Sequence, residues 1–290
     1  MDRYLSKRDT DFVRENLVFN YLLGNEQELL LKSYVHNNGI ELRFDPDCFY
    51  FFMTGRHKKF NGPHTPETFF SGVSNIYLAY GRLRAVLQEN GYDGNTFLIK
   101  EDNSKQLGIL FSAVRKTKVS PQEAAEKLYA AYLEYAPSRN YISTSFVGPY
   151  SGYEAIHRAF LDARALNDLL FFGVRDRVIT KEFYEQTVRP CDPSVIIANI
   201  RRQLSLACTG TRAKAIRQAE YLIDTLIRPS YSMKNYKLMQ STFEDFRNTL
   251  NIVYGDCLSL PNRDADLIWQ LDSYKDAFIR STDLFFDQIG

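Results

Sequence analysis

The sequence predicts an α+β fold for the first part of the chain and a helical arrangement for the rest. Between residues 46 and 180, apolar runs and amphipathic patterns alternate in the order strand, helix, strand, strand, helix, strand. From Lys181 onward the strand-like alternation disappears and helical spacing takes over. We therefore expect a helical lead-in over 1–45, an α/β domain over 46–180 and a helical domain over 181–290.

Composition favours a cytoplasmic, well-packed globular protein. The 290 residues include 36 basic and 35 acidic side chains, and this balance does not point to a global nucleic-acid or membrane surface. Aromatic residues make up 14% of the chain, which argues against disorder. No apolar run approaches the roughly 20 residues that cross a bilayer, and the first residues lack the apolar core of a signal peptide. The expected localisation is cytoplasmic, without membrane contact.

Neither the cysteines nor the histidines are spaced like a metal or redox site. The cysteines lie far apart, as expected for small buried side chains in a reducing compartment. They are Cys48, Cys191, Cys208 and Cys257. His57 and His64 share one polar connection, but no further ligand stands at a useful spacing. His36 is expected near a helix end and His157 on a polar helix flank, so the sequence predicts no metal ligand.

The lead-in is expected to contain two short helices. Asp11 fits the cap of the first helix and Gly24 fits its end, with apolar residues at helical spacing between them. The second helix is expected from about Glu26 to His36, before Gly39.

The first strand of the α/β domain is predicted at residues 48–53. Continuous apolarity with aromatic enrichment suits a central strand that is covered on both faces. After a polar connection, Thr65 and Pro66 fit the N-cap and the first position of a helix, which Asn90 and Gly91 would end. The apolar stripe of this helix comprises Phe69, Val73, Ile76, Tyr77, Tyr80, Leu83 and Leu87.

A hairpin is predicted over residues 96–114, where two apolar strands flank a polar turn at Glu101–Lys105. The turn has no glycine pair. Glu101 and Asp102 are adjacent acids, and neighbours on a strand point to opposite faces, so at most one of them can bind a given metal. The simplest interpretation of these two acids is a solvated turn.

The next helix has a strong start signal. Ser120, Pro121 and Glu123 combine a serine cap, a proline at the first position and a glutamate that reaches back. The helix is expected to end before Pro137, and residues 141–147 read as the following strand.

The α/β domain is expected to close with one more helix and two apolar segments. Ser151 and Glu154 predict a second capping box. The inward residues of that helix would be Ile156, Ala159, Phe160, Ala163 and Leu166. The segments 170–173 and 177–179 are expected to complete the domain.

Several helices are expected in the last third. Their predicted starts are Asp192, Thr211, a position after Pro229, and Asp264 or Asp266. The helix after Thr211 would bury Ala213, Ile216, Ala219, Tyr221, Leu222 and Leu226. The helix after Pro229 is expected to run to about Tyr254.

Basic residues cluster modestly in this region, at Arg201, Arg202, Arg212, Lys214 and Arg217. A helix-turn-helix DNA reader would place such residues on one face of a short second helix. The predicted helices are too long and too apolar for that, and Glu220 and Asp224 interrupt the basic run. A solvated helical face is the favoured interpretation.

The chain also lacks the glycine-rich phosphate-binding motifs and the GxSxG elbow of hydrolases.

The run Tyr141–Ile179 closely resembles a segment of the large AraC-type response regulators of Gram-positive bacteria. The matching positions are Gly148, Ser151, Glu154, Ala163, Arg164, Phe171, Phe172, Val178 and Ile179. The predicted first helix with Leu22, Leu23 and Gly24, followed by an apolar strand, is similar to the start of the same middle module. The resemblance covers most of residues 12–180.

The resemblance implies a degenerate GGDEF-like domain. The implied fold is a ferredoxin-like, nucleotide-cyclase-like antiparallel sheet with helices, followed by an all-α domain. In cyclases of this order the hairpin carries glycines and acids that hold a nucleotide and its metals, whereas Glu101–Lys105 has no glycine. We therefore expect no catalytic, cofactor-binding or metal-binding residues.

The implied function is a non-catalytic module that transmits a signal or holds a dimer within a transcriptional regulator. A receiver domain and an AraC-type DNA-binding domain are expected outside this chain, so DNA would be contacted only through the latter. The expected partner is a second copy of the chain. The interaction surface is expected on the last helix, at Trp269, Tyr274 and Phe278.

Two other functions stay open from the sequence. In the first, a pocket between the two domains senses a small-molecule effector. In the second, the chain is an active nucleotidyl cyclase. That function requires Glu101 or Asp102 to hold a divalent metal, either without further help or together with Asp45 or Asp47 near the first strand.

Overall fold

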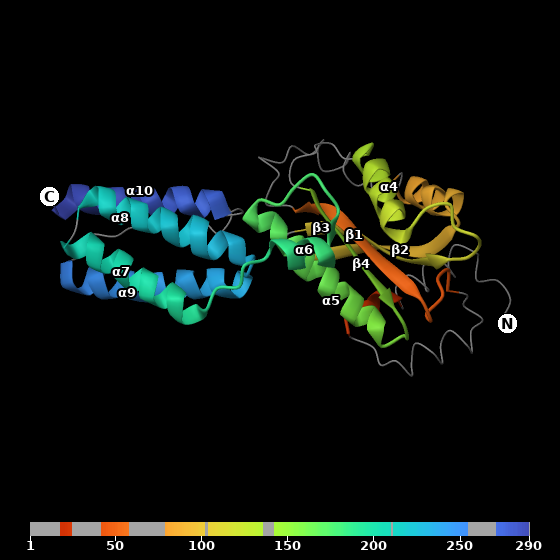
Figure 1. Ribbon diagram of the computed structural model, residues 1–290, viewed down its shortest axis with the longest axis horizontal. Coiled ribbons are helices and arrows are strands. Elements are labelled where there is room, and N and C mark those ends of the chain that lie inside the picture. Colours follow the sequence, from red (N-terminus) through yellow and green to blue (C-terminus); the bar gives the residue numbers. More distant parts are fainter. Residues whose placement is uncertain are drawn as a thin grey trace, which may run out of the picture. The chain divides into compact units, whose positions relative to one another are not determined.

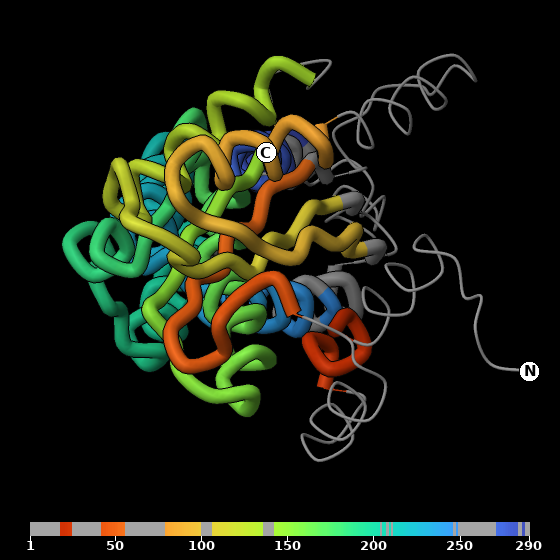
Figure 2. The backbone as a smooth tube through the Cα atoms, turned by 90° about the vertical axis from the view of Figure 1, so that its right-hand side faces the viewer, coloured from red at the N-terminus to blue at the C-terminus, as the bar shows by residue number. Residues whose placement is uncertain are grey.

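The structure is a computed structural model, drawn in Figure 1 and from a second side in Figure 2. It describes residues 18–24, 42–57, 79–101, 104–135, 142–209, 211–254 and 271–289. The chain divides into two compact units. The first comprises Met1–Asn167 with Arg175–Glu182, and the second comprises Asp168–Val174 with Phe183–Gly290. The chain thus crosses between the units three times, after residues 167, 174 and 182, whereas the sequence predicts one boundary near residue 181.

The first unit is built on a five-stranded sheet with the strand order β2-β3-β1-β4-β5. Its strands are β1 (Phe49–His57), β2 (Tyr92–Glu101), β3 (Ser104–Ala113), β4 (Ile142–Tyr150) and β5 (Ile179–Thr180). β1 lies antiparallel to β3 and β4, and β2 lies antiparallel to β3. β5 pairs in parallel with β4. The α+β class is confirmed, but the sheet is mixed rather than wholly antiparallel, because α5 returns the chain to a strand that runs beside β4.

Helices pack on both faces of this sheet. Phe52 on β1 belongs to an apolar cluster with Leu83 of the helix at residues 79–89 and Leu128 of α4 (Pro121–Leu133). The preceding residue Phe51 points to the other face. There its ring meets Phe160 of α5 (Ala155–Asn167), with 6.5 Å between ring centroids. The prediction of a central first strand covered on both faces is confirmed.

The start of α4 follows the predicted capping box. The Ser120 hydroxyl oxygen accepts a bond from the Glu123 backbone N–H at 3.2 Å, and the Ser120 backbone N–H donates to the Glu123 carboxylate at 2.8 Å. The bond from the Ser120 backbone lowers the pKa of the Glu123 carboxyl. The helix at residues 79–89 ends, as predicted, at Asn90 and Gly91, where Gly91 has φ +90°.

Two local predictions for the end of the α/β part are wrong. α5 begins at Ala155 rather than directly after Ser151, because Gly152 takes a left-handed φ of +89° and donates its N–H to the Pro46 carbonyl at 2.8 Å. The segment 170–173 falls largely within a 3-10 helix, η2 (Asp168–Phe172), which belongs to the second unit. Its apolar residues had been expected in the α/β core.

In the second unit, every described element is helical. Besides η2 it contains most of α6 (Lys181–Thr187), α7 (Pro193–Thr209), α8 (Arg212–Glu220), the π-helix η3 (Tyr221–Ile227), the 3-10 turn η4 (Arg228–Ser230), α9 (Met233–Tyr254) and α10 (Leu271–Ile289). α8 packs against α7 and α10, and α7 packs against α9 (Figure 1). Phe243 of α9 touches Phe278 of α10, with 4.5 Å between ring centroids, so the four long helices enclose one core.

The buried face of the α8–η3 stretch differs from the predicted one. Ala213 and Tyr221, which were expected to point inward, are exposed. Ala219 and Leu222 are buried as predicted, and Ala215, Ile223 and Ile227 are buried with them. A step of four residues goes about 40° beyond a full turn on an α-helix but falls short of a full turn on the wider π-helix, so the buried face shifts where η3 begins. The Arg228 backbone N–H accordingly bonds to the Ile223 carbonyl, five residues back.

None of the helices that the structure describes has the length and apolarity required to span a membrane.

Candidate functional site

The hairpin of the first unit was the main candidate site. β2 and β3 pair without interruption from Tyr92 opposite Ala113 to Glu101 opposite Ser104. Only residues 102 and 103 separate the two strands, and both lie outside the described residues, so the position of Asp102 is not described. Glu101 is the last residue of β2. The two strands therefore stay paired up to the predicted turn.

The strand positions beside this turn are mainly basic. Lys100 on β2 lies opposite Lys105 on β3, which in turn lies opposite Arg56 on β1. The next row holds Glu101, Ser104 and His57. The strand positions paired next to the turn therefore include three Lys or Arg residues and one acidic residue, Glu101.

The other two candidate carboxylates lie at the opposite end of the sheet. The Asp45 backbone N–H donates to the Ser112 hydroxyl at 2.7 Å, and an Asp45 carboxylate oxygen accepts from the Asp47 backbone N–H at 2.9 Å. Ser112 is eight positions along β3 from Ser104, which corresponds to about 26 Å at roughly 3.3 Å per residue. Asp45 and Asp47 therefore cannot share a metal with Glu101.

Between these two ends, Thr54 and Asn95 bond to structural partners. The hydroxyl oxygens of Thr54 on β1 and Thr144 on β4 lie 2.8 Å apart, and both residues are fully buried. The Asn95 side-chain oxygen accepts from the Arg43 backbone N–H at 2.8 Å. Among the described residues, no three histidine, cysteine, aspartate or glutamate side chains gather in a way that could hold a metal ion.

His157 has a structural contact that the sequence did not reveal. Its Nδ1 lies 2.6 Å from the Leu22 carbonyl oxygen, and its ring packs so closely on Gly24 that an added Cβ there would lie 3.0 Å from the ring. His157 is thus half-buried and attaches the segment at residues 18–24 to α5, rather than lying on an open polar flank. His36 and His64 lie outside the described residues.

Of the described cysteines, Cys191 is partly buried. Burial, followed by the charge of Asp192, raises the pKa of its thiol, which disfavours the reactive thiolate. Cys48 is exposed.

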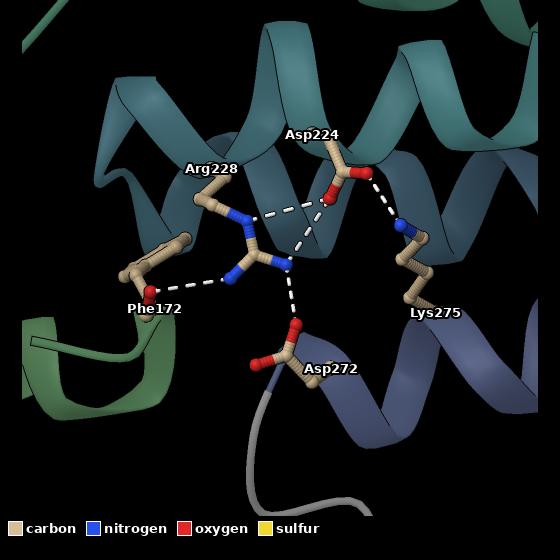
Figure 3. A network of polar contacts seen from close by, with 5 residues as sticks. All are labelled: Phe172, Asp224, Arg228, Asp272 and Lys275. Carbon is tan, nitrogen blue, oxygen red and sulfur yellow. Dashed lines mark hydrogen bonds and ion pairs between the residues drawn. The ribbon is translucent and has the colours of Figure 1, made fainter.

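The second unit contains a network of charged side chains centred on Arg228 (Figure 3). The guanidinium bonds to an Asp224 carboxylate oxygen at 3.2 Å, to the Asp272 carboxylate, and to the Phe172 carbonyl oxygen at 3.4 Å. Lys275 donates to the other carboxylate oxygen of Asp224. The network therefore joins η2, η3 and the first turn of α10, which are far apart in the sequence.

The charges of this network are mutually satisfied. Partial burial by itself raises the pKa of the Asp224 carboxyl, but the bonds from Lys275 and Arg228 outweigh it, so the pKa is lowered overall. Burial likewise opposes the charge of Arg228, but bonds to Asp272 and Asp224 raise its pKa. Two carboxylates and two cations hold one another in place, an arrangement that suits a structural clamp rather than acid–base chemistry. The i,i+4 spacing of Asp224 and Arg228 was a signal for it.

The predicted interaction surface on the last helix is wrong for the residues that the structure describes. Tyr274 and Phe278 are 5% and 1% exposed and belong to the core of the second unit. Their rings contact those of Tyr236 and Phe243 on α9. Trp269 lies outside the described residues. Aromatic residues at helical spacing here fill the space between two helices.

No protein-family model matches the chain, and the search of curated proteins returns no match either.

Proposed function

We propose that this chain is a non-catalytic regulatory module of a transcriptional regulator, with a ferredoxin-like, nucleotide-cyclase-like first unit that lacks cyclase chemistry. The elements of the first unit follow the order β1, a helix, β2, β3, α4 and β4, and β1 and β3 lie antiparallel at the centre of the sheet. This arrangement supports the kinship. The resemblance of Tyr141–Ile179 to AraC-type response regulators supports the regulatory role.

The separation of the candidate carboxylates is the observation that carries the proposal. Nucleotidyl transfer needs carboxylates that converge on divalent cations next to the phosphates. Here Asp45 and Asp47 stand about 26 Å along the sheet from Glu101. The positions opposite one another near the hairpin turn are Lys100, Lys105 and Arg56. This arrangement favours communication over catalysis.

A nucleotide turnover assay tests the proposal. The chain is incubated with GTP or ATP and either Mg²⁺ or Mn²⁺, and the products are separated by chromatography. We expect no cyclic mono- or dinucleotide and no released pyrophosphate, because the candidate carboxylates Asp45 and Asp47 lie too far from Glu101 to share a metal with it. An established cyclase serves as the positive control.

A double variant, Glu101→Ala with Asp102→Ala, completes the assay. Its chromatogram is expected to match that of the wild type. Product formed by the wild type and abolished in this variant would contradict the proposal, since it would assign metal-dependent catalysis to the hairpin acids.

A further inference from the structure

The α7–α8 hairpin carries charge of almost one sign. Residues 193–221 contain five basic side chains and a single acid, Glu220. The basic residues are Arg201, Arg202, Arg212, Lys214 and Arg217, and all five are exposed. Arg212 pairs with Asp283 and Asp287 of α10. Within the described part of the chain, no carboxylate pairs with the other four.

An amide–amide hydrogen bond fixes how α7 and α8 lie against each other. The Gln218 side-chain nitrogen donates to the Asn199 side-chain oxygen at 3.0 Å, and Gln218 is only 8% exposed. The Asn199 side-chain nitrogen donates to the Val195 carbonyl at 2.8 Å, which holds its amide in place. α7 and α8 follow each other directly in the chain and pack as an antiparallel pair (Figure 1). The bond therefore sets their register.

This register divides the outer surface between the two helices into two ends. Residues three or four positions apart share a helix face. Val195 and Arg202 therefore flank the α7 amide, while Tyr221 and Lys214 flank the α8 amide. Because the helices are antiparallel, Val195 lies on the side of Tyr221, and Arg202 lies on the side of Lys214. We call these four residues the α7–α8 seam.

The two ends of the α7–α8 seam differ in chemistry. Val195 and Tyr221 form an apolar end, and their side chains are 41% and 46% exposed. Arg202 and Lys214 form a basic end, with Arg217 next to it on α8. The seven positions from Val195 to Arg202 correspond to about 10 Å, or roughly two helical turns.

We infer that the α7–α8 seam is a docking surface for an acidic amphipathic helix of a partner protein. Such a helix would set an apolar side chain against Val195 and Tyr221, and carboxylates two turns away against Arg202 and Lys214. In a symmetric pair of copies joined through this surface, the four seam residues of each copy would bring no carboxylate, so the cations would stay unneutralised. Duplex DNA would neutralise the basic end but would leave the apolar end without a partner.

A designed peptide provides the test. The probe is a fluorescein-labelled helical peptide with two leucines one turn apart and three glutamates two turns further on. A matched peptide has serine in place of the leucines, and a short DNA duplex is the third probe. Fluorescence anisotropy with the full chain is expected to give micromolar binding of the leucine peptide and weaker binding of the other two.

Charge reversal locates the binding. The double variant Arg202→Glu with Lys214→Glu is expected to weaken leucine-peptide binding about tenfold or more. Val195→Ser with Tyr221→Ser should weaken it about fivefold. The matched control is Lys237→Glu with Arg280→Glu, which makes the same charge change at exposed positions of α9 and α10. It should alter affinity by less than about twofold.

Far-UV circular dichroism checks that each variant is folded. Should the double charge reversal unfold, Lys214→Ala replaces it, with an expected loss of about threefold.

Three results would overturn the inference. The first is no binding of the leucine peptide. The second is equal or tighter binding of the serine peptide or of the duplex, which would indicate plain electrostatics or a nucleic-acid surface. The third is an equal loss of affinity in the α9–α10 control.

Discussion

Replacing Arg228 by alanine is expected to lower the free energy of unfolding by about 2 kcal/mol. The side chain is 27% exposed and bonds to Asp224, Asp272 and the Phe172 carbonyl, so its removal leaves two carboxylates with one cation. The aliphatic part of the side chain is lost as well. Urea unfolding followed by circular dichroism measures the change, and hydrogen exchange should place it at the start of α10.

A matched arginine on the first unit is the control. Arg158 lies 3.8 Å from Asp162 at the same i,i+4 spacing, but it is 76% exposed. Arg158→Ala should therefore change the unfolding free energy by less than about 0.5 kcal/mol. Arg228→Lys should recover only part of the loss, because an ammonium cannot match the planar fork of a guanidinium. Equal effects of the two alanine variants would mean that the network adds nothing to stability.

The effect of Arg228→Ala should also depend on pH. The pKa of the Asp224 carboxyl is lowered in the folded chain. Its contribution is therefore present above the ordinary aspartate pKa of about 3.9 and is lost as the pH falls through the lower folded-state value. The difference between wild type and Arg228→Ala should be constant near neutral pH and shrink below about pH 4. A difference that grows on acidification would contradict the assignment.

Replacing Gly94 by alanine is expected to destabilise the first unit by about 3 kcal/mol. A Cβ added to Gly94 would lie 2.4 Å from the Leu110 carbonyl oxygen and 2.8 Å from the Phe111 Cβ. Both atoms belong to the neighbouring strand, so relief requires β2 and β3 to separate. Urea unfolding gives the size of the effect, and loss of hydrogen-exchange protection in β2 and β3 would localise it.

Gly81→Ala is the matched control and should act in the opposite direction. Gly81 is exposed within the helix at residues 79–89, and an added Cβ there meets nothing within 4 Å. The variant should be more stable than wild type by roughly 1 kcal/mol, because alanine loses less backbone entropy in a helix. Similar destabilisation by both substitutions would show that close strand approach at Gly94 is not the cause.

Sequence patterns predicted those features that depend on neighbouring residues. The Ser120 capping box and the Gly91 helix end need only a few residues in a row, and both are confirmed. The inward face of α5 was also correct, since Ile156 and Phe160 are buried. In these places local preference and tertiary packing favour the same conformation.

The failures occur where distant parts of the chain decide the conformation. Ser151 and Glu154 have the residue types of a capping box, but the Pro46 carbonyl binds the N–H of Gly152 and the helix starts later. The predicted apolar face after Thr211 was correct at Ala219 and Leu222 but missed Ile223 and Ile227, which lie in the π-helix η3. A pattern read at 3.6 residues per turn cannot anticipate that wider turn.

The candidate site could be predicted only in part. The sequence identified the hairpin and its glycine-free turn, but the distance between Asp45 and Glu101 follows from strand register, which composition does not determine. The aromatic residues Tyr274 and Phe278 were assigned to a surface because helical spacing cannot tell a buried stripe from an exposed one. The Arg228 network joins η2, η3 and α10, and no local pattern links all three.

A distance measurement tests the central claim most directly. Spin labels are placed at residues 47 and 101 by Asp47→Cys and Glu101→Cys, in a chain whose native cysteines are replaced by serine, and pulsed electron paramagnetic resonance gives their separation. With the two positions at opposite ends of the sheet, the separation should be about 25–35 Å, labels included. A separation below about 15 Å would bring the carboxylates within reach of a common metal site and would contradict the account.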